Sequence, residues 1–348
     1  MVQQRSYSIP SSVSSADAQH DTQAEQAAPR KAEHPVIPTI GEQDGLAYFQ
    51  GRIAPMSEAM VSVATHGLHY GTGCFEGIRA YWNAEQQQLY VLKLREHFER
   101  FAHSRHMLMM SSRESVDELC SITLDLLRQQ NVRTDAYIRP VAYKSARTIK
   151  LALSALEDTV SIYAFPMGDY VDISAGLNVC VSNWRRVSGN SVPVRAKTTG
   201  GYINSALAVD EAAAAGFDEA IFLTQSGTVS EGSSCNLFVV KHGRISTPRA
   251  ADDILEGITR DAVMQMAAQD LGISTEVRAI ERTELYDADE VFFTGTGVQV
   301  SPVTRVDRRA IGNGQPGPIT MELQRRYLRA VRGEDPNYSD WVTPVYPK

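Results

Sequence analysis

The sequence has little of what metal centres, disulfide frameworks and membrane spans require. Its cysteines are few and far apart, with no Cys-x-x-Cys pair, namely Cys74, Cys120, Cys180 and Cys235. This spacing favours reduced thiols over a zinc site or disulfides. The eight histidines do not cluster like ligands, so we expect no metal. No apolar run approaches the ~20 residues that a membrane-spanning helix needs, and we expect no membrane partner.

The chain also lacks a basic stripe. Its formal net charge is −7 over 348 residues, which argues against nucleic acid as a main partner. Length and composition are typical of a soluble globular protein with one large domain or two ordinary ones. Together with the reduced cysteines, these features predict a cytoplasmic protein.

The first residues differ from the rest of the chain. They are rich in Ser, Gln, Ala and Pro and have little periodic apolar content. Such a segment buries too little surface to offset the entropy of ordering, so we predict a disordered tail over residues 1–43. A cleaved targeting segment is the alternative, which Asp17, Asp21 and Glu25 disfavour.

Beyond Leu46 the pattern predicts an α+β fold with two α/β domains. In the first we expect a hairpin at Gly51, strands over 75–82, 88–92, 136–143 and 160–165, a helix over 96–110, and another that starts with a capping box of Ser115 and Glu118. In the second we expect helices over 202–215 and 259–271 and strands over 219–224, 237–241 and 290–294. The predicted ranges are 44–166 for the small domain, 167–174 for a linker and 175–335 for the large domain.

Lys197, one of only seven lysines, stands in an unusual setting. A strand-like approach ends at it, Gly200 and Gly201 follow, and a helix begins at Tyr202. Glycines let a bulky planar group approach the backbone, and Tyr202 could place a phenol beside the amine. By itself, however, Lys197 would be interpreted as a solvated turn residue.

Glu231 is an acidic residue in a run of small residues, followed by an apolar strand. A carboxylate in such a place could hold a pyridine nitrogen protonated, so that the ring acts as an electron sink. The alternative is an exposed turn glutamate.

Two small-residue segments suit an anion. The helix that opens at Gly257-Ile258-Thr259 has unpaired first amides, although an ordinary threonine N-cap fits equally well. Gly295-Thr296-Gly297 ends a strand, where a phosphate or carboxylate could approach closely; the simpler interpretation is a Gly-rich turn.

Arg100 is a third candidate for an anion. It shares one side of its predicted helix with His97 and Ser104, and its guanidinium could reach a phosphate. The alternative is a surface arginine paired with Glu96, one turn away.

Eight stretches in order carry a resemblance over residues 46–330: HGLHYGTGCFEGIRAY (66–81), REHFERF (95–101), AYIRP (136–140), NWRR (183–186), AKTTGGYINS (196–205), VSEGSSCNLF (229–238), LEGITRD (255–261) and FFTGTG (292–297). Each is weak alone, but their order is specific. The chain resembles the fold-type IV aminotransferases that use pyridoxal 5'-phosphate (PLP), specifically the branched-chain amino acid aminotransferases. The resemblance implies an active site at the interface of the two domains.

The resemblance implies a role for each cofactor residue. Lys197 resembles the Schiff-base lysine, Tyr202 the tyrosine bonded to the phenolic oxygen of PLP, and Glu231 the partner of the pyridine nitrogen. Leu255 resembles the residue that packs on the pyridine ring. The phosphate is expected among Arg100, Gly257, Ile258, Thr259 and Thr296.

The resemblance also implies a substrate pocket. Phe75 and Gly77 should share one face of their strand, as should Tyr137 and Arg139. Tyr70 and Trp184 would add aromatic walls, and the amides of Thr296 and Gly297 would hold the substrate α-carboxylate. The aromatic walls suit a branched side chain, and Arg139 suits the γ-carboxylate of glutamate.

The implied reaction is transamination of branched-chain L-amino acids (Leu, Ile, Val) with 2-oxoglutarate, giving branched 2-oxo acids and L-glutamate, with Lys197 as general base. Alternatives are a D-amino acid or (R)-amine aminotransferase or an aminodeoxychorismate-type lyase of the same fold, and a non-catalytic PLP-binding protein. The pair FEGIRAY and AYIRP favours the first interpretation, and the complete Lys–Tyr–Glu set disfavours the last. Where the family often reads GTAAE, this chain has Gly295-Thr296-Gly297-Val298-Gln299.

The resemblance finally implies a homodimer or a higher homo-oligomer. In the family each site borrows a loop from the partner chain, and that loop would lie near residues 144–156.

Overall fold

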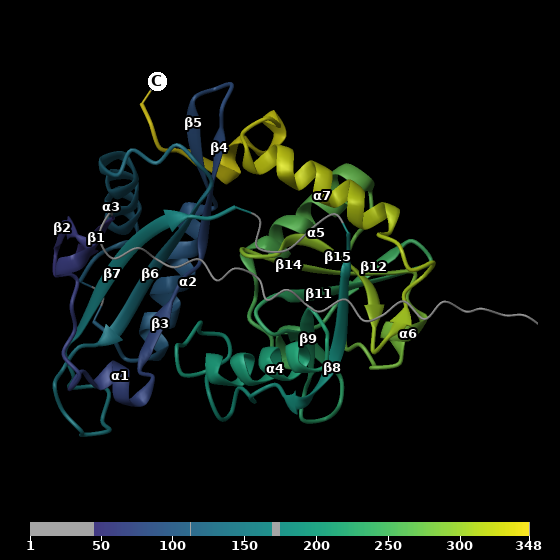
Figure 1. Ribbon diagram of the computed structural model, residues 1–348, viewed down its shortest axis with the longest axis horizontal. Coiled ribbons are helices and arrows are strands. Elements are labelled where there is room, and N and C mark those ends of the chain that lie inside the picture. The colour runs from purple at the N-terminus through teal and green to yellow at the C-terminus, as the bar shows by residue number, and fades with distance from the viewer. Residues whose placement is uncertain (1–44, 112, 169–174, 348) are drawn as a thin grey trace, which may run out of the picture. The chain divides into compact units, whose positions relative to one another are not determined.

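The structure is a computed structural model that describes residues 45–111, 113–168 and 175–347. The predicted tail over 1–43 lies outside the described residues, as do residues 169–174 of the predicted linker. Two sheets, each with its own helices, make up the described part (Figure 1). No helix in this part is long and apolar enough to cross a membrane.

The first sheet comes mostly from the N-terminal half and has the order β17-β5-β4-β6-β7-β1-β2, with β3 paired to β6. Its strands are β1 Leu46–Phe49, β2 Arg52–Pro55, β3 Gly73–Phe75, β4 Ile78–Asn83, β5 Gln88–Leu92, β6 Ala136–Lys144, β7 Asp158–Pro166 and β17 Val342–Pro344. The predicted hairpin is confirmed: Gln50 and Gly51 between β1 and β2 both have positive φ, as tight hairpin turns require. Because β17 pairs with β5, the C-terminus completes this sheet, outside both predicted domain ranges.

The strand predicted over 75–82 is wrong as a single element, because it is two strands, β3 and β4. Glu76 and Gly77 lie between them, and the Glu76 amide donates to the carbonyl of Pro140 at 2.9 Å. The Glu76 side chain turns away into a buried cluster described below. Phe75 and Gly77 therefore do not share one strand, although both stay close to the pocket.

The second sheet has the order β10-β9-β8-β15-β14-β11-β12-β13, with β16 paired to β15. Its strands are β8 Leu177–Arg185, β9 Glu219–Leu223, β10 Val229–Gly232, β11 Asn236–Lys241, β12 Arg244–Thr247, β13 Glu276–Val277, β14 Glu290–Gly295, β15 Gln299–Val306 and β16 Arg309–Ala310. The central strand β8 is parallel to both of its neighbours, β9 and β15. The strands predicted over 219–224, 237–241 and 290–294 are confirmed to within a residue.

Helices cover both sheets. They are α1 His66–Tyr70, α2 Leu94–Met107, α3 Val116–Gln129, α4 Tyr202–Ala214, α5 Ile258–Leu271, α6 Glu284–Asp287 and α7 Pro318–Val331, with short 3-10 turns η1 Met56–Glu58, η2 Ala250–Asp252 and η3 Pro336–Trp341. α2 packs on α3 and β3, α4 on β8 and β9, and α5 and α7 on β14. The predicted helices are confirmed, although α2 begins and ends earlier than the predicted 96–110.

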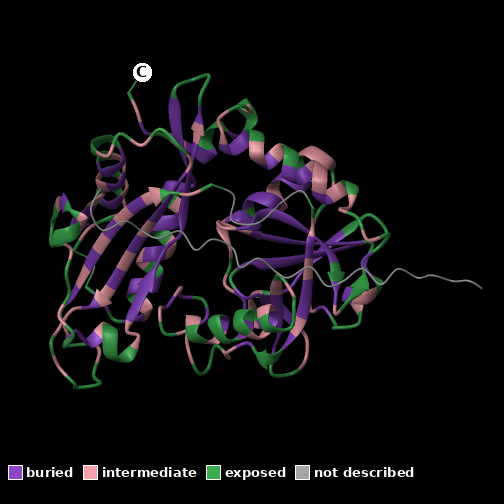
Figure 2. Ribbon diagram, viewed as in Figure 1, coloured by how far each residue is buried: buried purple, intermediate pink, exposed green. Residues whose placement is uncertain are grey.

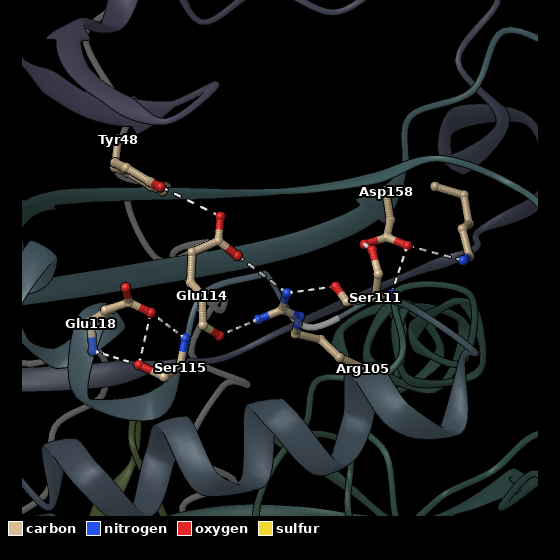
Figure 3. A network of polar contacts seen from close by, with 8 residues as sticks. Tyr48, Arg105, Ser111, Glu114, Ser115, Glu118 and Asp158 are labelled. Atoms are coloured by element: carbon tan, nitrogen blue, oxygen red, sulfur yellow. Dashed lines mark hydrogen bonds and ion pairs between the residues drawn. The ribbon is translucent and has the colours of Figure 1, made fainter.

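The segment between α2 and α3 is held by polar contacts (Figure 3). The predicted capping box is confirmed, because Ser115 accepts from the Glu118 amide at 3.3 Å and Glu118 accepts from the Ser115 amide at 2.7 Å. Arg105 of α2 donates to the carbonyl of Ser111 at 3.0 Å and to the Glu114 carboxylate at 3.2 Å. These contacts fix the C-terminal end of α2, the helix that brings Arg100 to the pocket.

The strands of both sheets are largely buried (Figure 2). One apolar cluster joins elements of the two sheets, because Tyr81 and Tyr90 of the first pack with Phe238 and Phe292 of the second and with Tyr327 of α7. This shared packing gives the pocket walls that come from different sheets a rigid support.

Candidate functional site

One pocket gathers the residues predicted to bind a cofactor. Its empty volume, open solvent included, is about 530 Å³. Every one of the predicted cofactor residues lines it: Arg100, Lys197, Tyr202, Glu231, Leu255, Gly257, Ile258, Thr259 and Thr296. They come from α2, α4, α5 and β10 and from loops, one of which follows β14.

Lys197 meets the Tyr202 hydroxyl at the wall of this pocket. The Lys197 Nζ atom donates to Tyr202 Oη at 2.6 Å, and the Phe75 ring packs edge-on against Tyr202 with centroids 4.7 Å apart. The backbone of Lys197 is fixed on both sides, because its amide donates to Ser104 Oγ at 3.1 Å and its carbonyl accepts from the Phe75 amide at 3.0 Å. These contacts therefore fix the backbone of Lys197 at the wall of the pocket that its side chain lines.

The approach to Lys197 is a loop, so the strand-like segment expected before it is wrong. β8 ends at Arg185, and the loop then runs to α4 with Thr198 bridged to Cys74. The first glycine after the lysine also allows a close approach of two backbones. A Cβ on Gly71 would lie 2.8 Å from Gly200 Cα.

Glu231 lies on β10 and is almost fully buried, not exposed in a turn. Its carboxylate pairs with Arg186 at 2.8 Å and accepts from Asn236 Nδ2 at 2.9 Å and from the Leu255 amide at 3.1 Å. Burial raises the pKa of Glu231 above its ordinary value, although Arg186 acts in the opposite direction. In its ionised form, the Glu231 carboxylate can hold a proton on a partner nitrogen.

The start of α5 gives the pocket a place that suits a phosphate. α5 begins at Ile258, and its N-cap Gly257 has no side chain that could cap the first amides. A Cβ on Gly257 would overlap Asn236 Oδ1, so glycine is required there. The Thr296 hydroxyl donates to the carbonyl of Gly77 at 2.9 Å, which fixes the loop after β14.

Arg100 does not pair with Glu96, so the surface alternative is wrong; Glu96 instead pairs with Lys93 at 3.2 Å. Arg100 forms two hydrogen bonds to Glu76, from Nε at 2.7 Å and from Nη2 at 2.8 Å. The same carboxylate contacts His97 Nδ1 at 2.8 Å. Burial opposes ionisation of Glu76, but Arg100 and His97 outweigh it and hold the pKa of this carboxyl well below its usual range.

The residues predicted for the substrate pocket are only partly brought together. The Arg139 guanidinium lies 4.4 Å from the centroid of the Phe75 ring, and its Nη2 donates to Tyr137 Oη at 3.0 Å. Gly77 lies against this group, because a Cβ there would overlap the Tyr137 hydroxyl. The carbonyl of Gly297 accepts from Arg79 Nη1 at 3.4 Å.

Tyr70 and Trp184 do not line the pocket described above. The Tyr70 side chain is 41% exposed, and its hydroxyl donates to the carbonyl of Ile149 at 3.2 Å. Trp184 is 45% exposed near the end of β8.

The pocket fits PLP by the chemistry of its donors. It offers an amine paired with a phenol, a buried carboxylate, and a helix N-terminus with an arginine. The Thr294 hydroxyl is buried at its wall and has no hydrogen-bond partner within the described part of the chain, so a polar ligand atom would satisfy it.

Several residues of the site were not predicted. Glu76 and Arg186 carry the two ion pairs of the pocket, and Ser104 holds the Lys197 backbone. Glu76 and Arg186 stand in the stretches FEGIRAY and NWRR, but nothing local in the sequence pairs them with Arg100 and Glu231.

Known proteins are similar to this chain in sequence and in fold. A family model described as amino-transferase class IV matches residues 73–306. A probable branched-chain-amino-acid aminotransferase of Aquifex aeolicus (strain VF5) is 48% identical over 304 residues, which cover 87% of this chain and 97% of the relative.

Two solved structures are similar. The branched-chain aminotransferase from the thermophilic archaea Thermoproteus uzoniensis, solved with norvaline, has a TM-score of 0.83 and 43% identity, covering 87% of this chain and 99% of that chain. The branched-chain amino acid aminotransferase from Thermobaculum terrenum, solved in its PLP-form (holo-form), has a TM-score of 0.84 and 36% identity, covering 88% of this chain and 100% of that chain.

Proposed function

Because this chain belongs to the class IV aminotransferase family, we propose that it is a PLP-dependent aminotransferase of branched-chain L-amino acids. It moves the amino group of Leu, Ile or Val to 2-oxoglutarate and yields a branched 2-oxo acid and L-glutamate. The observation that carries the proposal is the convergence of Lys197, Tyr202 and Glu231 on one pocket that Arg100 and the first residues of α5 also line.

PLP, when bound, supplies an aldehyde that exchanges amino groups and a ring that takes up electrons. Lys197 Nζ is the only amine at the pocket wall among the described residues, so it is the proposed base for the substrate α-proton. Tyr202 Oη, 2.6 Å away, holds that amine in place and would face the phenolic oxygen. Glu231 would hold a proton on the pyridine nitrogen, and Arg100 with the first amides of α5 would bind the phosphate.

The substrate side rests on Phe75, Tyr137 and Arg139. The Arg139 guanidinium and Lys197 Nζ lie 4.4 and 5.2 Å from the centroid of the Phe75 ring, so an apolar surface and a cation adjoin the amine. The apolar surface suits a branched side chain and the cation suits the γ-carboxylate of glutamate. The amides of Thr296 and Gly297 are the proposed donors to the α-carboxylate.

The function is tested with purified protein saturated with PLP. We expect a yellow protein whose absorbance shifts to that of the aminated cofactor on addition of L-leucine and returns on addition of 2-oxoglutarate. Lys197→Ala should abolish the shift, whereas Lys241→Ala, at a lysine paired with Asp287 and Asp289, should not. A shift with D-alanine and none with L-leucine would sink the branched-chain assignment.

A homodimer is the proposed assembly. Apolar side chains are exposed near α1 and on the loop over 145–156 that follows β6, including Ile149 at 83% and Leu151 at 70%. His66 and Tyr70 of α1 bind this loop through the carbonyls of Lys150 and Ile149, so the apolar residues form one fixed surface. Such a surface favours association with a second copy, whose loop could reach the first pocket.

Sedimentation velocity at micromolar concentration tests this assembly. Wild type should sediment as a dimer or larger, and Ile149→Asp with Leu151→Asp should shift it to monomer. Val277→Asp, at an exposed apolar residue of β13, is the matched control. A monomeric wild type would contradict the proposal.

We also propose that the protein acts in the cytoplasm. All four cysteines are free, as expected in a reducing compartment. Cell fractionation followed by immunodetection tests it, and recovery in an extracytoplasmic fraction would contradict it.

A further inference from the structure

Glu76 is the most buried carboxylate near the pocket, with no exposed surface at all. It lies between β3 and β4 and accepts three hydrogen bonds, two from Arg100 and one from His97, at 2.7 to 2.8 Å. Because the pKa of Glu76 is held low, its oxygens carry no proton, and His97 Nδ1 must donate. The carboxylate is thus fully satisfied by α2.

These bonds determine where the Arg100 guanidinium points. Nε and one N–H of Nη2 are taken by Glu76, and Nη1 donates to the carbonyl of Glu256 at 3.0 Å. Glu256 precedes α5, the helix whose N-terminus forms the anion end of the pocket. The fork is therefore held by the β3–β4 segment and by the residue before α5, and its two other N–H groups are left for a ligand of the pocket that Arg100 lines.

A buried ion pair contributes little net stability, because desolvation of both charges offsets their attraction. Its value lies in fixed geometry, which an arginine needs in order to bind a phosphate with two oxygens. The neighbours of Glu76 in sequence agree with such a role, since Phe75 packs on Tyr202 and Gly77 accepts from Thr296.

We propose that Glu76, supported by His97, is a positioning residue that fixes Arg100 for recognition of the cofactor phosphate. The proposal rests on the proposed function. A role in orientation and a role through charge predict opposite changes in phosphate affinity when Glu76 is neutralised. By charge alone, neutralising Glu76 would make the net charge around Arg100 more positive and would strengthen phosphate binding. If Glu76 acts by orientation, the same change weakens phosphate binding.

The test compares PLP with pyridoxal, which carries the same aldehyde and ring without the phosphate. Apoprotein is titrated with each ligand, and the dissociation constant of pyridoxal divided by that of PLP measures phosphate recognition apart from the chemistry at Lys197. Glu76→Gln should lower this quotient by about tenfold or more, as loss of an outer-shell partner does at other sites. The affinity for pyridoxal itself should change less than about twofold.

Glu114→Gln is the matched control, because Glu114 pairs with Arg105 on the same helix and does not line the pocket. It should leave the quotient unchanged. Arg100→Met should lower the quotient, and Glu76→Gln added to it should have no further effect, since the residue acts through the arginine. Should Glu76→Gln not fold, Glu76→Asp replaces it with the same readout, because the shorter side chain cannot reach both nitrogens.

The outcomes separate the two proposals. Wild-type apoprotein that binds neither ligand overturns the proposed function. Wild-type binding of PLP, with an unchanged or raised quotient in the Glu76 variant, overturns only the role of Glu76. Equal losses of both affinities, which leave the quotient unchanged, likewise overturn it, because they would mark a general structural defect.

Discussion

The carboxylate of Glu231 pairs with the guanidinium of Arg186 at 2.8 Å, and both side chains are almost fully buried. Burial raises the pKa of the carboxyl, and Arg186 is the largest influence that lowers it. By lowering the pKa, the arginine therefore extends to lower pH the range over which Glu231 is an anion. Only the anion can hold a proton on the pyridine nitrogen.

Replacing Arg186 should shift the pH dependence of the reaction. In Arg186→Met the pKa of Glu231 rises further, so the carboxyl becomes an anion only at higher pH. The acidic limb of kcat/KM for L-leucine should move upward by about one pH unit or more, so that activity is lost at pH values below the limb. Profiles from about pH 5.5 to about pH 9 measure this. Arg185→Met, at the exposed neighbour on β8, should leave the limb in place; an unmoved limb in Arg186→Met would refute the argument.

Removing the Tyr202 hydroxyl should slow the chemical step. The Lys197 amine loses its 2.6 Å partner in Tyr202→Phe, while the ring contact with Phe75 is kept. A hydrogen bond between neutral groups contributes about 1 kcal/mol, so kcat should fall by about fivefold. Single-turnover absorbance with L-leucine measures the step directly. A rate within twofold of wild type would show that the contact does not matter for the amine.

Local signals in the sequence predict much of this structure. Ser115 and Glu118 form a capping box because both partners lie within one turn, and the hairpin at Gly51 follows from its own backbone freedom. The Lys197–Tyr202 contact can likewise be predicted, because the two residues lie on either side of a helix start. In these cases the interacting atoms are near neighbours in the chain.

The ion pairs of the pocket could not be predicted in this way. Glu96 is one turn from Arg100 and is the expected local partner, but Arg100 turns inward to Glu76, which lies 24 residues earlier. The strand predicted over 75–82 is interrupted at the same residue. Glu76 lies between β3 and β4, and its carboxylate is directed at α2. The packing of α2 against β3 determines whether Arg100 binds Glu96 or Glu76. The periodicity of the sequence does not predict that packing.

Adding a methyl group at Gly77 should disturb the substrate side of the pocket. Its Cβ would overlap the Tyr137 hydroxyl, which accepts from Arg139 at 3.0 Å. In Gly77→Ala the tyrosine must move and Arg139 loses its partner, so KM for 2-oxoglutarate should rise by about tenfold. Dissociation constants for PLP should change little, because Gly77 does not line the cofactor pocket. An unchanged KM would place the γ-carboxylate elsewhere; Gly168→Ala, with open space around its Cβ, is the matched control.

Glu290 of β14 caps α7 from outside that helix, and its loss should affect stability without affecting catalysis. One carboxylate oxygen accepts from the Ile319 amide at 3.0 Å, and the other accepts from the Thr320 amide at 2.8 Å and the Thr320 hydroxyl at 2.6 Å. An anion at a helix N-terminus satisfies unpaired amides and interacts favourably with the helix dipole. Glu290→Gln keeps the shape but loses the charge and one acceptor, so the free energy of unfolding should fall by about 1 to 3 kcal/mol.

Urea unfolding of the apoprotein measures this change. The same substitution at Glu322, a residue of α7 that pairs with Arg325 and Arg326 at the surface, should cost less than about 0.5 kcal/mol. Both variants should keep the wild-type kcat at temperatures below the transition, because neither residue lines the pocket. Equal losses of stability would mean that the buried cap contributes no more than a surface ion pair, and that α7 is held on β14 and β15 by its apolar face alone.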